Sequence, residues 1–237
     1  MKNLLILVGG SAGLGAALYD QFLELDYEIV EFSRSGNKQG HIDVDLSHKE
    51  SAIDGIDQAF SQLSESSWKK VVLILNAAQI SPIGDLSTSE PKQWWQHIEV
   101  NFTMPISIVG RFQTHFQALN CEKTIAFVSS GAATSVIEGW SLYSGSKAGV
   151  EHFMRVVAQE QSAQAYPINC AILNPGIMDT NMQATIRSAS AEHFSNVEWF
   201  QQVHENGQLA TPDAVAKNIV KLLSKPFESG QVFNVSA

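Results

Sequence analysis

The sequence contains little cysteine, little charge and no excess of positive charge. Its two cysteines, Cys121 and Cys170, lie far apart and outside any CxxC pair, so neither a disulfide framework nor a cysteine-based zinc site is indicated. Histidines and carboxylates show no recognisable metal-ligand spacing either. Charged residues make up 16% of the 237 residues, and the formal net charge is −9. Binding of nucleic acid would need clustered positive charge, so we expect neither a metal nor a nucleic-acid partner.

Long apolar runs are missing as well. The N-terminal run Leu4–Val8 is too short for the apolar core of a secretory signal, and glycines end it at once. No later stretch approaches the length of a membrane span. We therefore expect a cytoplasmic protein with no membrane partner.

Short apolar segments instead alternate with segments of helical periodicity. With 44% hydrophobic residues, the chain can bury a sizeable core. The alternation predicts one α/β domain over residues 1–237, built on a doubly wound parallel sheet of about seven strands flanked by helices. The expected strands are Leu4–Val8, Tyr27–Phe32, His41–Leu46, Val71–Leu75, Thr124–Ser129, Ile168–Leu173 and Gln231–Val235. The expected helices are Ala16–Leu25, Lys49–Leu63, Pro91–Leu119 (with Pro105 as the position that would kink it), Ser141–Gln161 and Pro212–Leu223, and a polar, irregular stretch is expected at Ile177–Gln208.

A glycine-rich turn lies directly between the first strand and the first helix. In a doubly wound sheet, ligands bind beyond the carboxyl ends of the strands, which is where this turn falls. Glycines in GxxxGxG spacing let the backbone turn sharply and approach a pyrophosphate at a helix N-terminus. A plain tight turn is the alternative, but the position favours a dinucleotide site. The residues expected to contact the dinucleotide here are Gly9, Ser11, Ala12, Gly13, Leu14 and Gly15.

The end of the second strand indicates which nicotinamide cofactor is used. An acidic residue there would hydrogen-bond the ribose 2′-hydroxyl of NAD, whereas this chain has Ser33 and Arg34. A hydroxyl and a guanidinium suit a 2′-phosphate, so NADP(H) is the expected cofactor. Glu31, two residues before Ser33, is a weaker candidate for contacting the ribose. Asp45 and Leu46 are expected to meet the adenine.

Ser130, Tyr143 and Lys147 fall within one strand–loop–helix unit and make the strongest catalytic pattern. Tyr143 and Lys147 are four residues apart, so on a helix they share one face. A phenol has an ordinary pKa of about 10, and a nearby ammonium lowers that pKa. Tyr143 is then expected to donate a proton to a carbonyl oxygen as hydride reaches the carbon, while Ser130 orients that oxygen.

These residues, taken together, resemble the short-chain dehydrogenase/reductase family along essentially the whole chain. The family fold is the Rossmann fold. The segments that carry the resemblance are the glycine turn, Leu75-Asn76-Ala77-Ala78, Val100-Asn101, Ser129-Ser130, the YxxxK motif from Tyr143 to Lys147, and Asn174-Pro175-Gly176. Three positions depart from the family pattern: Val8 replaces a threonine, Leu75 an asparagine and Gln79 a glycine. The departures affect local loop geometry rather than the cofactor.

The resemblance assigns roles to individual residues. It implies a catalytic tetrad of Asn101, Ser130, Tyr143 and Lys147, in which Asn101 helps to anchor a water linking Lys147 to solvent. Lys147 would also contact the nicotinamide ribose, and a homodimer or homotetramer is implied. The cofactor contacts implied beyond the glycine turn are Asn76, Ala77, Ala78, Tyr143, Lys147, Pro175, Gly176, Ile177 and Thr180.

Within the family, the chain is most similar to sepiapterin reductases and bacterial benzil reductases. The similar segments are 129–133, 139–143, 176–183 and 205–209. The likeness implies NADPH-dependent reduction of a small carbonyl substrate, a ketone next to another carbonyl or a ring. Its pocket would be bounded by Ser130, Tyr143, Trp140 and a substrate-covering segment at about 177–210, in which Met182, Trp199 and Phe200 are candidates to line it.

Two other functions stay open. One is reduction of a 3-oxoacyl thioester on a carrier protein. The net negative charge of this chain disfavours it, because an acidic carrier prefers a basic docking surface. The other is an NADP(H)-sensing regulator without turnover, which the complete Ser130–Tyr143–Lys147 set disfavours. His97 and His115, on the long helix, are expected to be surface or interface residues rather than ligands.

Overall fold

A seven-stranded parallel sheet organises the computed structural model, which describes residues 1–237. The strand order is β3-β2-β1-β4-β5-β6-β7, so the direction of winding reverses between β1 and β4. The strands are β1 (Lys2–Val8), β2 (Tyr27–Ser33), β3 (His41–Asp43), β4 (Trp68–Leu75), β5 (Glu122–Val128), β6 (Ile168–Asn174) and β7 (Val232–Asn234). The predicted doubly wound α/β fold is confirmed, although β3 ends at Asp43 rather than at Leu46.

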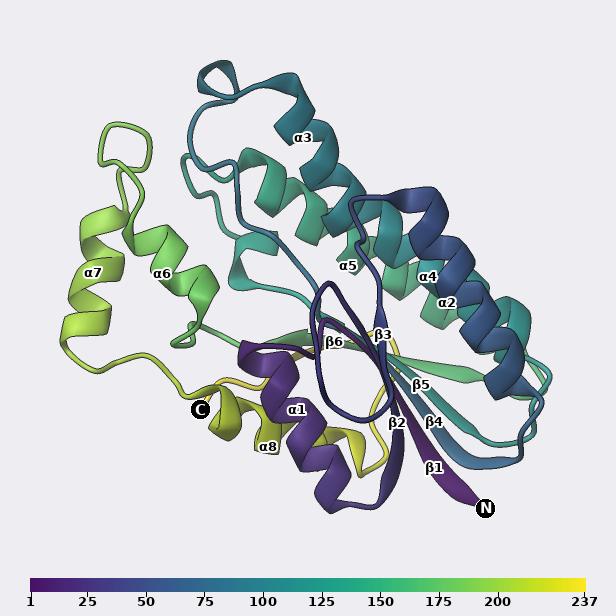
Figure 1. Cartoon of the computed structure of the whole chain (residues 1–237). Helices are drawn as coiled ribbons and strands as arrows, with labels where there is room; N and C mark the ends of the chain where they lie inside the picture. The colour runs from purple at the N-terminus through teal and green to yellow at the C-terminus, as the bar shows by residue number, and fades with distance from the viewer.

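Helices cover both faces of the sheet (Figure 1). On one face, α1 (Gly13–Glu24) and α8 (Pro212–Leu223) pack against alternate residues of the central strands, such as Leu5 and Leu7. On the other face, α2 (Lys49–Ser64), α4 (Met104–Phe116) and α5 (Ser141–Gln161) pack against Leu4, Ile6 and Val8. Burial on both faces explains why these strands are continuous apolar runs rather than alternating ones.

The long helix expected at 91–119 is interrupted by a π-helical segment. It consists of α3 (Pro91–Ile98), the five-residue π-helix η2 (Glu99–Thr103) and α4. Pro105 has no N–H to donate to the carbonyl of Asn101 four residues earlier, and the Met104 N–H instead bonds to Glu99. The irregularity therefore lies just before Pro105 and places Asn101 within it. Such π-bulges are frequent at functional sites.

The prediction of an irregular stretch at 177–208 is wrong. The segment forms α6 (Asn181–Arg187) and α7 (Val197–Glu205), which stand beyond the carboxyl ends of the strands (Figure 1). Thr180 caps α6 by accepting a hydrogen bond from the backbone N–H of Gln183. A bridge between Met178 and Ala210 joins the two ends of the segment. No helix of the chain has the length and apolar character needed to cross a membrane.

Candidate active site

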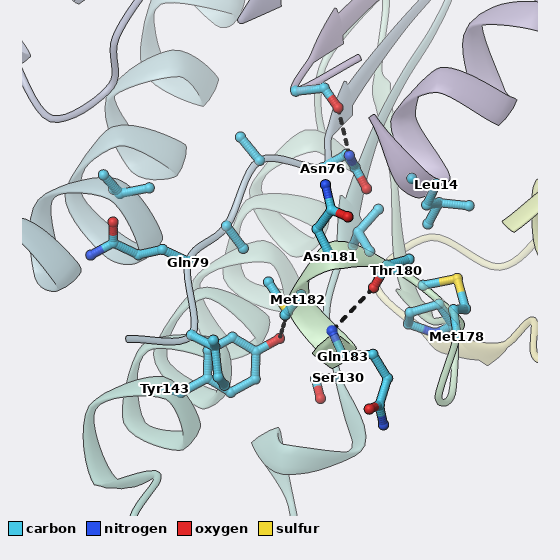
Figure 2. Close-up of a pocket in the computed structure, with 18 of the residues that line it drawn as sticks. Leu14, Asn76, Gln79, Ser130, Tyr143, Met178, Thr180, Asn181, Met182 and Gln183 are labelled. Carbon is cyan, nitrogen blue, oxygen red and sulfur yellow. Dashed lines mark hydrogen bonds between the residues drawn. The ribbon is translucent and has the colours of Figure 1, made fainter. Parts of the chain in front are cut away.

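The glycine turn after β1 is packed against the loop after β4. Gly9 has φ +89°, and a side chain there would overlap Ala77. A side chain at Gly15 would overlap the Gly9 carbonyl, and that carbonyl accepts a 2.7 Å hydrogen bond from the Asn76 amide (Figure 2). Ala12, at the N-cap of α1, provides no side-chain acceptor for the first-turn N–H groups. Those N–H groups are consequently available to an anion such as a pyrophosphate.

Glu31 supports this turn by a hydrogen bond from inside the protein. Its side chain is buried, and its Oε1 accepts a 2.7 Å hydrogen bond from the Gly10 N–H. Its Oε2 accepts a 2.6 Å bond from His41 Nδ1 and a 3.1 Å bond from the Ser33 hydroxyl. Because every oxygen of this carboxylate is used inside the protein, the weaker ribose candidate of the sequence is corrected to a structural role.

A cavity of about 650 Å³ runs from the glycine turn to α6 and α7. Ser33 and the exposed Arg34 lie at one end, with Asp45 and Leu46 beside them. Burial by itself would raise the pKa of Asp45, but hydrogen bonds from Ser47 and the nearby charge of Arg34 lower it overall. All the residues expected to bind the cofactor line this cavity except Gly15, which instead allows Gly9 to pack closely.

Ser130, Tyr143 and Lys147 line the middle of the same cavity. Ser130 follows β5, and its hydroxyl accepts a 3.2 Å hydrogen bond from the Ala132 N–H. Lys147 Nζ donates a 2.7 Å bond to the Val128 carbonyl at the end of β5 and lies 5.6 Å from the Tyr143 ring centre. Burial lowers the pKa of Lys147 to about 7, against the opposing effect of Glu151.

The pKa of Tyr143 is raised rather than lowered. Burial raises it to about 12, and a hydrogen bond from Ser130 opposes the rise. The expected lowering by Lys147 is not found because the phenol is enclosed and the Lys147 ammonium is turned to Val128. Tyr143 is therefore fully protonated at neutral pH, which is the form that donates a proton.

The Tyr143 hydroxyl meets a side chain of α6. Its oxygen lies 4.0 Å from the Met182 sulfur, and Figure 2 shows the hydroxyl directed at Met182. Met182 thus occupies the approach to the hydroxyl from the side of the segment expected to cover a substrate.

Asn101 lies behind the cavity rather than in it. Its Oδ1 accepts a 2.9 Å bond from the Gln79 N–H, and its Nδ2 donates to the Gln79 carbonyl at 2.7 Å and to His97 Nε2 at 2.7 Å. Both N–H groups of the amide are used in this way, so its side chain fixes the loop after β4 and is not directed toward Lys147. The cavity-lining residues do not include Asn101, and its predicted part in a water link to Lys147 stays a prediction.

The expectation that His97 lies on a helix surface or at an interface is wrong. It is fully buried, not on a helix surface, and its Nδ1 donates a 2.8 Å bond to the Ser81 carbonyl. Its Nε2 is then the acceptor for Asn101, and its ring meets the Tyr143 ring edge-on at 6.3 Å. Burial lowers the pKa of His97, so the neutral imidazole persists. His115, in contrast, is bound to Asp57 at 2.7 Å, far from the cavity-lining residues.

Glu151 is a further buried group that the sequence analysis missed. Its Oε1 accepts a 2.7 Å bond from the Ser129 hydroxyl, and its Oε2 lies 3.3 Å from Arg155. Ser129 directly precedes Ser130, and Glu151 lies one helical turn after Lys147 on α5. Glu151 therefore joins α5 to the end of β5, next to Ser130 in one segment and one turn from Lys147 in the other. The four-residue spacing from Lys147 was the available signal.

Aromatic and aliphatic side chains enclose the end of the cavity beyond Tyr143. Trp140 stacks on Phe194 at 5.3 Å and meets Phe200 at 5.5 Å. Ile80 and Ile186 belong to the same buried cluster. Trp140, Met182, Trp199 and Phe200 all line the cavity, as the sequence suggested. No three His, Cys, Asp or Glu side chains lie together as a metal ion would require.

Comparison with known proteins finds relatives that match nearly the whole chain. The model of the short chain dehydrogenase family matches residues 3–191. A benzil reductase ((S)-benzoin forming) from Bacillus subtilis is 33% identical over 98% of this chain and 98% of its own. The Bacillus cereus protein of the same name is 31% identical over 97% of this chain and 98% of its own.

More distant matches agree with these. A sepiapterin reductase from Xenopus tropicalis is 25% identical over 73% of this chain and 66% of its own. The structure of ElxO with NADP bound superposes with a TM-score of 0.78 at 23% identity, over 99% of this chain and 97% of the other.

Proposed function

The chain belongs to the short-chain dehydrogenase family, and on that premise we propose that it is an NADPH-dependent reductase of ketones and vicinal dicarbonyls, with Tyr143 as the proton donor. The observation that carries the proposal is the single cavity that joins the glycine turn to Ser130, Tyr143 and Lys147 and continues into an aromatic end. The names of the two Bacillus relatives support the substrate class.

The residues present fit NADP(H). The free N–H groups at the start of α1 suit a pyrophosphate, and the exposed Arg34 suits a 2′-phosphate. Glu31, the carboxylate that would repel that phosphate, is held by Gly10, His41 and Ser33 instead. ElxO, with NADP bound, has the same fold. When bound, the cofactor supplies the hydride.

The side chains then have distinct tasks. Ser130 donates a hydrogen bond to the carbonyl oxygen and orients it, and Tyr143 transfers its proton to that oxygen as the carbon receives hydride. Lys147 lies between the Val128 carbonyl and the Tyr143 ring, and its task is to bind the nicotinamide ribose. Its pKa is lowered to about 7, so it adds positive charge near the phenol only while it is protonated. The aromatic end excludes water from the reacting carbonyl.

The charges of the cavity favour a diketone over a pterin. Asp45 is the one carboxylate that lines the cavity, and it lies at the opposite end from Trp140 and Phe200, next to Ser33 and Arg34. A pterin ring carries amino and N–H donors that need a buried acceptor of comparable strength. The aromatic end has no carboxylate to supply one, whereas two phenyl rings and two carbonyl oxygens require none.

The test is NADPH oxidation with benzil, a smaller diketone, sepiapterin and an acetoacetyl thioester, each repeated with NADH. Turnover of the diketones with NADPH is expected. Turnover of the thioester alone would support the carrier-protein reductase instead. Tight NADPH binding without turnover of any substrate would support the sensing regulator.

A further inference from the structure

Two buried hydrogen-bond donors in the cavity wall have no partner. Among the buried side-chain atoms that lack a hydrogen bond, two belong to cavity-lining residues, and these are Trp140 Nε1 and Gln183 Nε2. Both atoms are donors, so a ligand with acceptor oxygens would complement them. A buried donor without an acceptor costs free energy, and a ligand that brings one recovers that cost.

The orientation of the Gln183 amide is fixed from outside the cavity. Arg187 lies one turn later on α6, and its NH1 donates a 2.9 Å hydrogen bond to Gln183 Oε1. Arg187 is itself drawn toward Asp179, 3.8 Å away. A guanidinium only donates, so the amide oxygen must face Arg187 and the NH₂ group must point to the other side. Gln183 is 3% exposed and its Nε2 is buried, so solvent does not satisfy that group.

Gln183 is the neighbour of the residue that contacts the proton donor. Met182 lies 4.0 Å from the Tyr143 hydroxyl, and Figure 2 shows Met182 and Gln183 on the same short helix beside Ser130 and Tyr143. A ketone oxygen that binds Tyr143 has to displace the Met182 sulfur. Gln183, the next residue of α6, also lines the cavity, and its Nε2 is covered in the structure. A substrate that displaces Met182 is expected to uncover this group.

We propose that the Gln183 side-chain amide binds the second, unreacted carbonyl oxygen of a vicinal dicarbonyl substrate and so sets the specificity for dicarbonyls over simple ketones. The inference rests on the proposed function. The reacting oxygen lies between Ser130 and Tyr143, and the adjacent oxygen accepts from Gln183 Nε2. Hydride adds to one carbonyl carbon, the π-electron pair moves to its oxygen, Tyr143 protonates that oxygen, and the second carbonyl is unchanged.

The test compares benzil with deoxybenzoin, which has the same two phenyl rings but a methylene in place of one carbonyl. Gln183→Leu should lower kcat/KM for benzil about tenfold to a hundredfold and leave deoxybenzoin within about twofold. Arg187→Met, which frees the amide to turn, should give a smaller loss with benzil only. Gln202→Leu, the same change at an exposed position of α7, is the matched control and should alter neither substrate.

The inference would be overturned if Gln183→Leu lowered kcat/KM equally for benzil and deoxybenzoin, or lowered it for neither. A benzil-selective loss in Trp140→Phe with none in Gln183→Leu would also overturn it. If the wild-type protein reduces no ketone, the proposed function fails, and calorimetric binding of benzil and deoxybenzoin to the NADP⁺ complex then decides the role of Gln183. A benzil preference that disappears in Gln183→Leu supports it, and equal affinities in the wild type contradict it.

Discussion

The hydroxyl of Tyr143 and the sulfur of Met182 are in contact at 4.0 Å, so a side chain of α6 covers the group that we propose as the proton donor. A ketone has to replace that contact before it can be protonated. The covering residue is flexible and unbranched, which suits a group that must move aside. Substrate size is therefore expected to depend on Met182.

Met182→Ala should raise kcat/KM for benzil severalfold relative to a small diketone such as diacetyl. The truncated side chain leaves room for two rings and removes the contact that a substrate must displace. Met182→Leu keeps the bulk and should leave the benzil-to-diacetyl ratio unchanged. The measurement is the ratio of kcat/KM for benzil to kcat/KM for diacetyl. If Met182→Ala changes both values equally, Met182 does not select substrates by size.

Tyr143→Phe should reduce turnover by about a hundredfold to ten-thousandfold, since general acid catalysis contributes about 10²–10⁴-fold and the phenol is buried next to Lys147. NADPH affinity, measured by fluorescence titration, should change little because the ring remains. Substantial residual activity would show that another group donates the proton.

Arg34→Asp should weaken NADPH binding about tenfold to a hundredfold and affect NADH far less, because the charge at the exposed end of the cavity reverses. Separate dissociation constants for the two cofactors test this. Lys92→Asp, the same reversal of charge at an exposed position outside the cavity, should preserve the cofactor preference and serves as the control. An unchanged preference in Arg34→Asp would mean that the 2′-phosphate is held elsewhere.

Glu151→Gln should move the pH dependence of reduction to lower pH. Burial lowers the pKa of Lys147 to about 7, and the Glu151 carboxylate opposes this, so neutralising it lowers the pKa of Lys147 further. The Lys147 ammonium is lost as the pH rises through its pKa, so the decline of kcat/KM on the alkaline side should begin at lower pH in the variant.

Ser129→Ala distinguishes the effect of the Glu151 charge from the effect of the position of its side chain. It removes the 2.7 Å hydrogen bond to Glu151 but keeps the carboxylate charge. Its kcat should fall while its pH profile stays where the wild type has it. Identical pH profiles for Glu151→Gln and the wild type would limit Glu151 to a structural role.

Local sequence patterns predicted the fold and the glycine turn that we propose as the cofactor site. Buried parallel strands are continuous apolar runs, and the glycine turn has a position as well as a spacing, so the seven strands and the turn follow directly. The YxxxK pair also follows from helical spacing. The arrangement of these residues around one cavity agrees with the roles assigned to them, which stay predictions until they are tested.

The parts that were missed depend on contacts between distant segments. Periodicity puts His97 on a helix but does not reveal that the loop carrying Ser81 and Gln79 covers it. The helices α6 and α7 are short, although Thr180 followed by Gln183 has the spacing of a helix-capping pair. Gln183 is a candidate to bind the second substrate oxygen because Arg187 fixes its amide and its Nε2 has no partner. Both features exist only in the folded chain.

The most direct measurement is the product of benzil and NADPH that carries deuterium at both C4 positions of the nicotinamide, analysed by mass spectrometry with the wild-type protein and with Tyr143→Phe. The account predicts benzoin carrying one deuterium on the carbinol carbon, formed in equal amount to the NADP⁺ released, from the wild type alone. No benzoin, benzoin without deuterium, or equal product from Tyr143→Phe would contradict it.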